Sequence, residues 1–412
     1  MRTSLIARGL YRIPALVWDQ GLLTLFDARL SVDDLPAPID VVSARSSDGI
    51  TWTTPEPAIV ETEHRGVGDV CLVTGDLCFH GLSNLAGFFE DPTDLEPRLA
   101  RRDVSGWTSI SMAHYFADVD AAFASSGTGL VLADGRWIQS FVVRRGREIS
   151  LRILRSDGHI TDIAGGNESA MTQLPSGRIV LHSRGVGHRL SSVSDDFGET
   201  FTPLEPVPEL IDPGCNGHVF YWKAAGMLAA THLADPDLRR HLVVDLSSDE
   251  GATWAHRITI EREEAAYSTA AEMPNGDVAV VWEAEGTRAI KCTVISVNDI
   301  SLRIDEPISD AISLRHVVIN DDHDGIEVAL PDASQWGEGV FKIVSNPDAS
   351  TQKIRTRGKP ARQTLEIGDE LVFDIRKGGE VAYGVTVPYD GRSLGKLNRI
   401  LEWGCRGRFA VL

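Results

Sequence analysis

Two stretches of the sequence share one pattern: "SVSDDFGETF" (192–201) and "SSDEGATW" (247–254). Each reads Ser-x-Asp-x-Gly-x-Thr followed by an aromatic residue. Asp and Ser side chains accept hydrogen bonds from nearby backbone amides, and Gly readily adopts the positive φ that a tight turn requires. The pattern therefore predicts a hairpin turn with an aromatic side chain packed beneath it, which we call the Asp-box turn.

Related turns recur along the chain. "RSSDGITW" (45–52) has one residue fewer before its Thr-Trp pair, "RDVSGWTS" (102–109) keeps Gly-Trp, and "RSDGHIT" (155–161) keeps the turn without the aromatic residue. The turns lie about 40 to 55 residues apart, and a strand-only repeat of this length is typical of a β-propeller blade. Unrelated hairpins that happen to share Asp-Gly turns are the alternative.

The fold class predicted is all-β: a six-bladed β-propeller over residues 1–300 with a small C-terminal β-domain over residues 301–412. No Asp-box turn occurs in the second range, although "GVFKIVS" and "EVAYGVTV" still read as strands. The acidic run "NDDHDG" (320–325) has two interpretations: a cation site built from Asp321, Asp322, His323 and Asp324, or a solvated loop.

Composition narrows the possible partners. The chain has 412 residues, 42% of them hydrophobic, and a formal net charge of −19. We expect no nucleic-acid partner, because phosphate binding needs a basic surface. We expect no membrane span either, because no apolar run approaches the roughly 20 residues that cross a bilayer.

The N-terminus and the cysteines favour a cytoplasmic protein. Arg8 and Arg12 interrupt the N-terminal residues before an apolar stretch accumulates, so a secretory signal is not expected. The five cysteines are odd in number and lack metal-ligand spacing, which favours reduced thiols. Secretion by another route stays open. No cofactor motif or transition-metal motif is present.

Three arginines stand where polar residues would meet at a propeller axis. Arg12 interrupts the apolar strand "YRIPAL" (11–16), Arg184 follows "HS" at a strand end, and Arg239 begins the strand after "DPDL". Arginines entering from three blades could clamp one planar anion through bidentate, charge-assisted hydrogen bonds. Taken singly, each could equally be a salt-bridge partner.

The Arg-Ile-Pro start together with the Asp-box turns resembles the exo-α-sialidases (neuraminidases), whose six-bladed propellers carry Asp boxes, or BNR repeats. The resemblance covers almost all of residues 1–300. It implies a retaining exo-α-sialidase, a glycoside hydrolase that removes terminal sialic acids from oligosaccharides or glycoconjugates. The family's mechanism requires no cofactor and no metal.

The resemblance also assigns roles by position. In "YSTAAEMPNGDVAVVWE" (267–283) the first residue matches a catalytic nucleophile, and the last matches the carboxylate that orients an arginine. The implied catalytic residues are Tyr267 as nucleophile, Glu168 as its base, and Asp34 as acid/base, with Asp33 as the fallback. The implied substrate-binding residues are the carboxylate-binding triad Arg12, Arg184 and Arg239 (or Arg240 in place of Arg239), then Arg29, Asp69 and Glu283.

The substrate explains these residue types. Most glycosidases use two carboxylates, and sialidases with a Tyr nucleophile are an exception. A sialic acid carries a carboxylate on its anomeric carbon, which would repel a carboxylate nucleophile, whereas a phenol approaches neutral. With a reference pKa of ~10, the phenol needs a base. His218 departs from the family pattern, standing where a small hydroxyl residue is expected near the glycerol side of the pocket.

Other functions remain compatible with the sequence. A trans-sialidase or an enzyme preferring the deaminated sialic acid KDN would use the same residues. A non-catalytic sialic-acid-binding propeller would need the arginines but neither Tyr267 nor Glu168. A five-bladed glycosidase with a carboxylate pair would also contain "SSDGITW", but it leaves Tyr267 and the Arg-Ile-Pro start unexplained.

Overall fold

The computed structural model describes residues 1–60 and 66–297 with their side chains, and beyond them only the backbone of seven strands. The chain divides into two compact units, Met1–Ser301 and Leu302–Leu412. Among the described residues, no helix is long and apolar enough to span a bilayer. The second unit contains β26 (Val318–Asp322), β27 (Gly325–Ala329), β28 (Gly339–Val344), β29 (Gln352–Arg355), β30 (Ala361–Gln363), β31 (Glu370–Lys377) and β32 (Glu380–Pro388).

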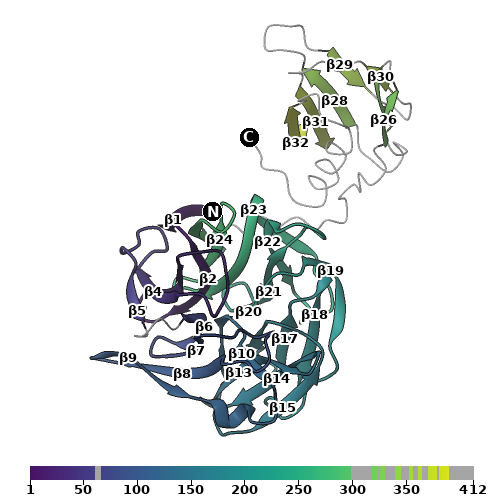
Figure 1. Cartoon of the computed structure of the whole chain (residues 1–412). Coiled ribbons are helices and arrows are strands. Elements are labelled where there is room, and N and C mark those ends of the chain that lie inside the picture. The colour runs from purple at the N-terminus through teal and green to yellow at the C-terminus, as the bar shows by residue number, and fades with distance from the viewer. Residues whose placement is uncertain are drawn as a thin grey trace. The chain divides into compact units, whose positions relative to one another are not determined.

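The first unit is a ring of four-stranded antiparallel blades (Figure 1). Blade 1 contains β2 (Tyr11–Trp18), β3 (Leu22–Arg29), β4 (Ile39–Ser46) and β5 (Glu56–Ile59). Blade 2 contains β6 (Gly66–Thr74), β7 (Leu77–Ser83), β8 (Glu96–Asp103) and β9 (Gly106–Ser111), followed by the short 3₁₀ helix η1 (Ala113–Phe116). Blade 3 contains β10 (Ala121–Ala124), β13 (Trp137–Arg145), β14 (Glu148–Arg155) and β15 (Ile160–Ala164), with the short strands β11 (Gly127–Thr128) on β6 and β12 (Leu130–Val131) on β13.

The remaining strands complete the ring. Blade 4 contains β16 (Ser169–Gln173), β17 (Ile179–Ser183), β18 (Val186–Ser194) and β19 (Glu205–Pro213). Blade 5 contains β20 (His218–Trp222), β21 (Met227–Leu233), β22 (Arg240–Ser247) and the first half of β23 (His256–Glu272). Blade 6 contains the second half of β23, then β24 (Val278–Ala284), β25 (Ala289–Ile295) and β1 (Arg2–Arg8).

One long strand joins the last two blades. β23 has 17 residues; it pairs with β22 as far as Glu264 and with β24 from Ala265 onward. Hydrogen bonds therefore merge blades 5 and 6 into one seven-stranded sheet, beside the four separate sheets of blades 1 to 4. Counting the merged sheet as two blades gives six, so the predicted six-bladed propeller is confirmed.

The Asp-box turns join the third strand of a blade to the fourth. In blade 5, Gly251 N donates to Ser247 Oγ (2.8 Å) and Thr253 N donates to Asp249 Oδ1 (2.8 Å). Gly251 has φ +95°, and the Trp254 side chain packs into the core beneath the turn. The same bonds recur over 46–51 and 194–200. The predicted turn chemistry is therefore confirmed in blades 1, 4 and 5.

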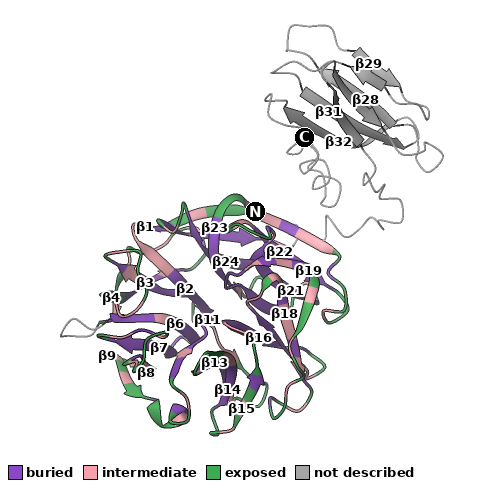
Figure 2. Cartoon of the chain, turned by 45° about the vertical axis from the view of Figure 1, so that its right-hand side comes forward, coloured by how far each residue is buried: buried purple, intermediate pink, exposed green. Residues whose placement is uncertain are grey.

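The core lies between the blades. Buried residues occupy the strands, and exposed residues concentrate in the connecting loops (Figure 2). Trp222 of blade 5 and Trp282 of blade 6 belong to one apolar cluster, and Trp222 Nε1 donates to Gly276 O across the boundary (2.7 Å). Large aromatic side chains bury much apolar surface and stabilise such packing. The packed blades thus provide a rigid scaffold for the polar residues at the axis.

Candidate active site

The predicted site residues gather at one end of the central axis. The first strands β2, β6, β10 and β20 lie toward the middle of the ring (Figure 1). Because the second strand is antiparallel to the first, it ends where the first begins. First strands supply Arg12, Asp69 and Tyr267, with Glu168 one residue before β16. The ends of second strands supply Arg29, Arg184 and Glu283, and Arg239 directly precedes the third strand of blade 5.

A bulge in β2 turns Arg12 toward the site. The register of β2 against β3 shifts between Arg12 and Ala15. Within it, Ile13 has φ +55°, which a β-branched residue rarely adopts. The Ile13 amide donates to Glu283 Oε1 (2.7 Å), and Arg12 Nε lies 3.4 Å from the same oxygen. The Arg-Ile-Pro sequence therefore builds a strained bulge that Glu283 holds in place.

Two further inner strands are irregular at their site residues. Pairing of β23 with β24 shifts register between Ala265 and Ser268, which brackets Tyr267. Pairing of β6 with β7 shifts between Gly68 and Cys71, and Asp69 within it has φ +56°. Bulges and strained backbone angles concentrate beside active sites, where they redirect side chains.

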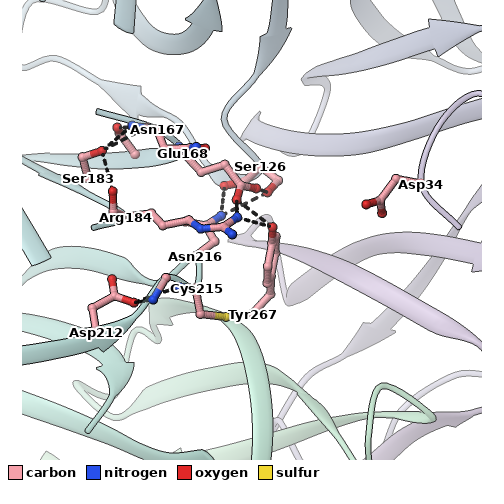
Figure 3. A network of polar contacts seen from close by, with 12 residues as sticks. Asp34, Ser126, Asn167, Glu168, Ser183, Arg184, Asp212, Cys215, Asn216 and Tyr267 are labelled. Carbon is pink, nitrogen blue, oxygen red and sulfur yellow. Dashed lines mark hydrogen bonds and ion pairs between the residues drawn. The ribbon is translucent and has the colours of Figure 1, made fainter. Parts of the chain in front are cut away.

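Tyr267, Glu168 and Arg184 form one hydrogen-bonded group (Figure 3). The Tyr267 hydroxyl donates to Glu168 Oε2 at 2.6 Å, and Arg184 Nη1 donates to the same oxygen at 2.7 Å. Arg184 Nη1 also lies 3.2 Å from the Tyr267 hydroxyl. Tyr267 is 8% exposed and Glu168 3%. A short hydrogen bond away from bulk water therefore links a phenol to a carboxylate that can accept its proton.

The surroundings keep this phenol protonated. Burial, reinforced by the neighbouring Glu168 carboxylate, raises the pKa of Tyr267 well above its ordinary value. Arg184 acts in the opposite direction. Tyr267 can therefore become a nucleophile only as its proton leaves, and Glu168 Oε2 is the acceptor within reach.

Two more arginines lie over the Tyr267 ring. The guanidinium carbon of Arg12 is 5.4 Å from the ring centroid, and that of Arg239 is 5.6 Å away. Arg240 points elsewhere and pairs with Asp235 (2.5 Å). The structure therefore brings Arg12, Arg184 and Arg239 together around one phenol. It also favours Arg239 over Arg240 as the third arginine.

Asp34 faces the arginines from a loop. Its Oδ1 accepts from Arg29 Nη1 (2.6 Å) and from Arg12 Nη1 (3.3 Å), yet its side chain is 71% exposed. Asp33 instead accepts a bond from the hydroxyl of its loop neighbour Ser31 (2.8 Å). Asp33 reaches Arg29 through its backbone carbonyl (3.0 Å), whereas Asp34 presents its carboxylate to the arginines, which makes Asp34 the stronger acid/base candidate.

Buried carboxylates lie behind the arginines. Asp27 accepts two bonds from the Arg29 guanidinium, at 2.8 and 3.2 Å, and no sequence signal had singled it out. Burial raises the pKa of Asp27, and the arginine opposes that rise. Burial, then repulsion from Asp27, raises the pKa of Asp69. Burial likewise raises the pKa of Glu283, against the effect of Arg12. Of these groups, Asp27 holds Arg29 and Glu283 contacts Arg12.

A second supporting element is the loop at 212–216, which sequence reasoning missed. Asp212 accepts from the buried Arg189 (2.9 Å) and from the amides of Gly214 and Cys215 (both 2.8 Å). The carbonyl of Gly214 accepts from Arg239 (3.3 Å). Removing one partner of such a buried ion pair costs about 3–5 kcal/mol, so the pair holds the loop firmly. No local pattern in "DPGCNGH" predicts these contacts.

Two other features predicted from the sequence have different outcomes. His218 was placed near the pocket by sequence. It is 5% exposed and stacks on Phe220, with ring centroids 5.9 Å apart. Its backbone belongs to β20, which directs the ring into the core. The side chains of the acidic run at Asp321 to Asp324 lie outside the described residues. Within the described part of the chain, no His, Cys, Asp or Glu cluster could hold a metal ion.

Comparison with known proteins agrees with this geometry. A sialidase of Micromonospora viridifaciens is 27% identical over 324 residues, covering 66% of this chain and 50% of that protein. The Hadza microbial sialidase Hz136 superposes with a TM-score of 0.62 at 21% identity, covering 70% of this chain and 66% of the other. The propeller is thus similar to sialidases in both sequence and fold.

A second solved sialidase has the same fold. The Trypanosoma rangeli sialidase, in complex with 2,3-difluorosialic acid as a covalent intermediate, superposes with a TM-score of 0.58 at 17% identity. The match covers 88% of this chain and 68% of the other. No family model matches the chain. The chain spans half the length of the Micromonospora sialidase, so the sialidase fold is shared although much of that relative has no counterpart here.

Proposed function

We propose that the chain is a retaining exo-α-sialidase that hydrolyses terminal sialic acids of oligosaccharides or glycoconjugates. The observation that carries the proposal is the 2.6 Å hydrogen bond from Tyr267 to Glu168 beneath three converging arginines. A binding protein would need the arginines to hold an anion, but not a phenol bonded to a buried base. Relatives named as sialidases support the same reaction class.

The reaction proceeds in two displacements. Arg12, Arg184 and Arg239 bind the sugar carboxylate through charge-assisted hydrogen bonds. The Tyr267 oxygen attacks the anomeric carbon while its proton passes to Glu168, and Asp34 protonates the leaving oxygen. Water, deprotonated by Asp34, then displaces the phenol, which recovers its proton from Glu168. Two inversions at one carbon retain the configuration.

The proposal is tested by mixing the full chain with the 4-methylumbelliferyl α-sialoside. We expect release of the fluorophore, and proton NMR of early time points should detect the α-anomer of the free sugar first. The β-anomer first would contradict the Tyr nucleophile. A sugar attached to another acceptor or to its own hydroxyl would indicate transfer instead of hydrolysis. No release, with free sialic acid still bound, would indicate a binding protein.

The two aspartates of the 30–38 loop give a matched pair for the acid. Asp34→Asn should lower kcat/KM for sialyllactose by roughly 10²–10⁴-fold, because the departing sugar oxygen needs a proton. The loss should be smaller with the methylumbelliferyl sialoside, because methylumbelliferone is a better leaving group than the sugar. Asp33→Asn should leave both rates near wild type, because the Asp33 carboxylate bonds to Ser31 and the bond from Arg29 to its backbone carbonyl survives the change. Equal losses in both variants would contradict the assignment of Asp34.

A further inference from the structure

The two oxygens of the Glu168 carboxylate have different partners (Figure 3). Oε2 accepts from Tyr267 (2.6 Å) and from Arg184 (2.7 Å). Oε1 accepts from the hydroxyl of Ser126 (3.0 Å). Ser126 and Glu168 are each 3% exposed, so water does not readily replace this bond. Ser126 follows β10 in blade 3, and neither its position nor its residue type suggested a role from sequence.

A neighbouring amide fixes the direction of the Ser126 bond. Asn216 Nδ2 donates to Ser126 Oγ (3.0 Å) and to the Ser126 backbone carbonyl (3.1 Å). A carbonyl only accepts, so the amide must present its nitrogen to Ser126. That nitrogen only donates, so Ser126 Oγ accepts from it and has its single proton left for Glu168. The two hydrogen bonds therefore have the same direction: Asn216 donates to Ser126, and Ser126 donates to Glu168 Oε1.

We propose that Ser126 is a positioning residue that keeps the transferred proton on Oε2 of Glu168. When the Tyr267 oxygen bonds to the anomeric carbon, its O–H bond breaks and the proton bonds to one carboxylate oxygen. Protonation of Oε1 would cost the bond from Ser126, whereas protonation of Oε2 keeps it. The protonated Oε2 then faces the phenolic oxygen and returns the same proton when the sugar leaves. This role rests on the proposed sialidase function.

The neighbouring serine provides a matched control. Ser125 is fully buried, and its hydroxyl has no hydrogen-bond partner among the described residues. Its backbone bonds, to Ser140 O and from Gln139 Nε2, survive a change to alanine. Ser125→Ala and Ser126→Ala thus remove the same atom from adjacent buried positions, but only the second removes a contact to Glu168.

The experiment measures kcat and KM of the full chain on the methylumbelliferyl sialoside across pH. For Ser126→Ala we expect kcat to fall about tenfold, the rate equivalent of one hydrogen bond to a charged group. KM should stay near wild type, because Ser126 donates to Glu168 and not to the sugar. The acid limb of the profile should move to higher pH, because the ionised carboxylate loses a donor that favours it. Ser125→Ala should match wild type, and Ser126→Thr, which keeps the hydroxyl, should recover most of kcat.

Two results would overturn the role of Ser126. In the first, the wild type is active and Ser126→Ala is indistinguishable from Ser125→Ala. In the second, Ser126→Ala changes KM alone. If Ser126→Ala does not fold, judged by its thermal unfolding, Ser126→Cys replaces it, because it has similar size and only a weak donor. A folded cysteine variant with full kcat would refute the role. An inactive wild type would instead refute the proposed sialidase function, and the role of Ser126 with it.

Discussion

Replacing Tyr267 with phenylalanine is expected to lower kcat/KM on a sialoside by roughly 10³-fold or more, as loss of a catalytic nucleophile does in other enzymes. The variant keeps the ring, over which the Arg12 and Arg239 guanidinium groups lie. It loses only the hydroxyl that donates to Glu168. Binding of free sialic acid, measured by calorimetry, should therefore change far less than the rate.

Covalent labelling tests the same role of Tyr267 directly. A 2,3-difluorosialic acid should add its sialyl mass to the wild-type protein, and peptide mapping should locate that mass on Tyr267. The phenylalanine variant should remain unlabelled. A label on Glu168, or full activity without Tyr267, would contradict the proposed mechanism.

The second large effect is expected at Arg239. Arg239→Ala should lower kcat/KM by roughly 10²-fold, because each charge-assisted hydrogen bond to the substrate carboxylate contributes about 1.5–3 kcal/mol. The neighbouring Arg240→Ala should leave kcat/KM almost unchanged, since Arg240 pairs with Asp235 away from Tyr267. Binding of free sialic acid should weaken in the first variant alone.

Comparing these two variants distinguishes direct contact with the substrate carboxylate from a general effect of positive charge. Both substitutions remove one positive charge from adjacent residues, so a general electrostatic effect on an anionic substrate would appear equally in both. Equal losses would mean that long-range attraction dominates and that Arg239 does not hold the carboxylate. A loss confined to Arg240→Ala would reverse the assignment of the third arginine.

The blade architecture was predictable because its signals are local. An Asp-box turn is complete within eight residues, and the spacing of "SSDEGATW" from its predecessors sets the length of a blade. The antiparallel order then places the ends of second strands beside the beginnings of first strands. Those two facts predict Arg184 at the axis, and the resemblance to the exo-α-sialidases adds Tyr267 to the same site.

The supporting residues were not predictable in this way. Asp27 reads as an ordinary strand residue, although its partner Arg29 lies two residues further along the same strand. Ser126 reads as part of a small-residue stretch, because its partner Glu168 lies at the next blade. The positive φ of Ile13 has no local signal, since an isoleucine argues against it. That angle depends on Glu283, 270 residues away, accepting the Ile13 amide bond. Contacts of this kind appear only when the ring is closed.

Ring closure has a consequence for biosynthesis. β1 is the earliest strand of the propeller to be translated, but its partner β25 is the latest. At ribosomal rates of about 5–20 residues per second, β1 waits roughly 15 to 60 s for that partner. An unpaired strand edge invites association with other chains, and charged residues discourage it. Arg2 and Arg8, at the two ends of β1, place such charges on the strand while the nascent chain is still incomplete.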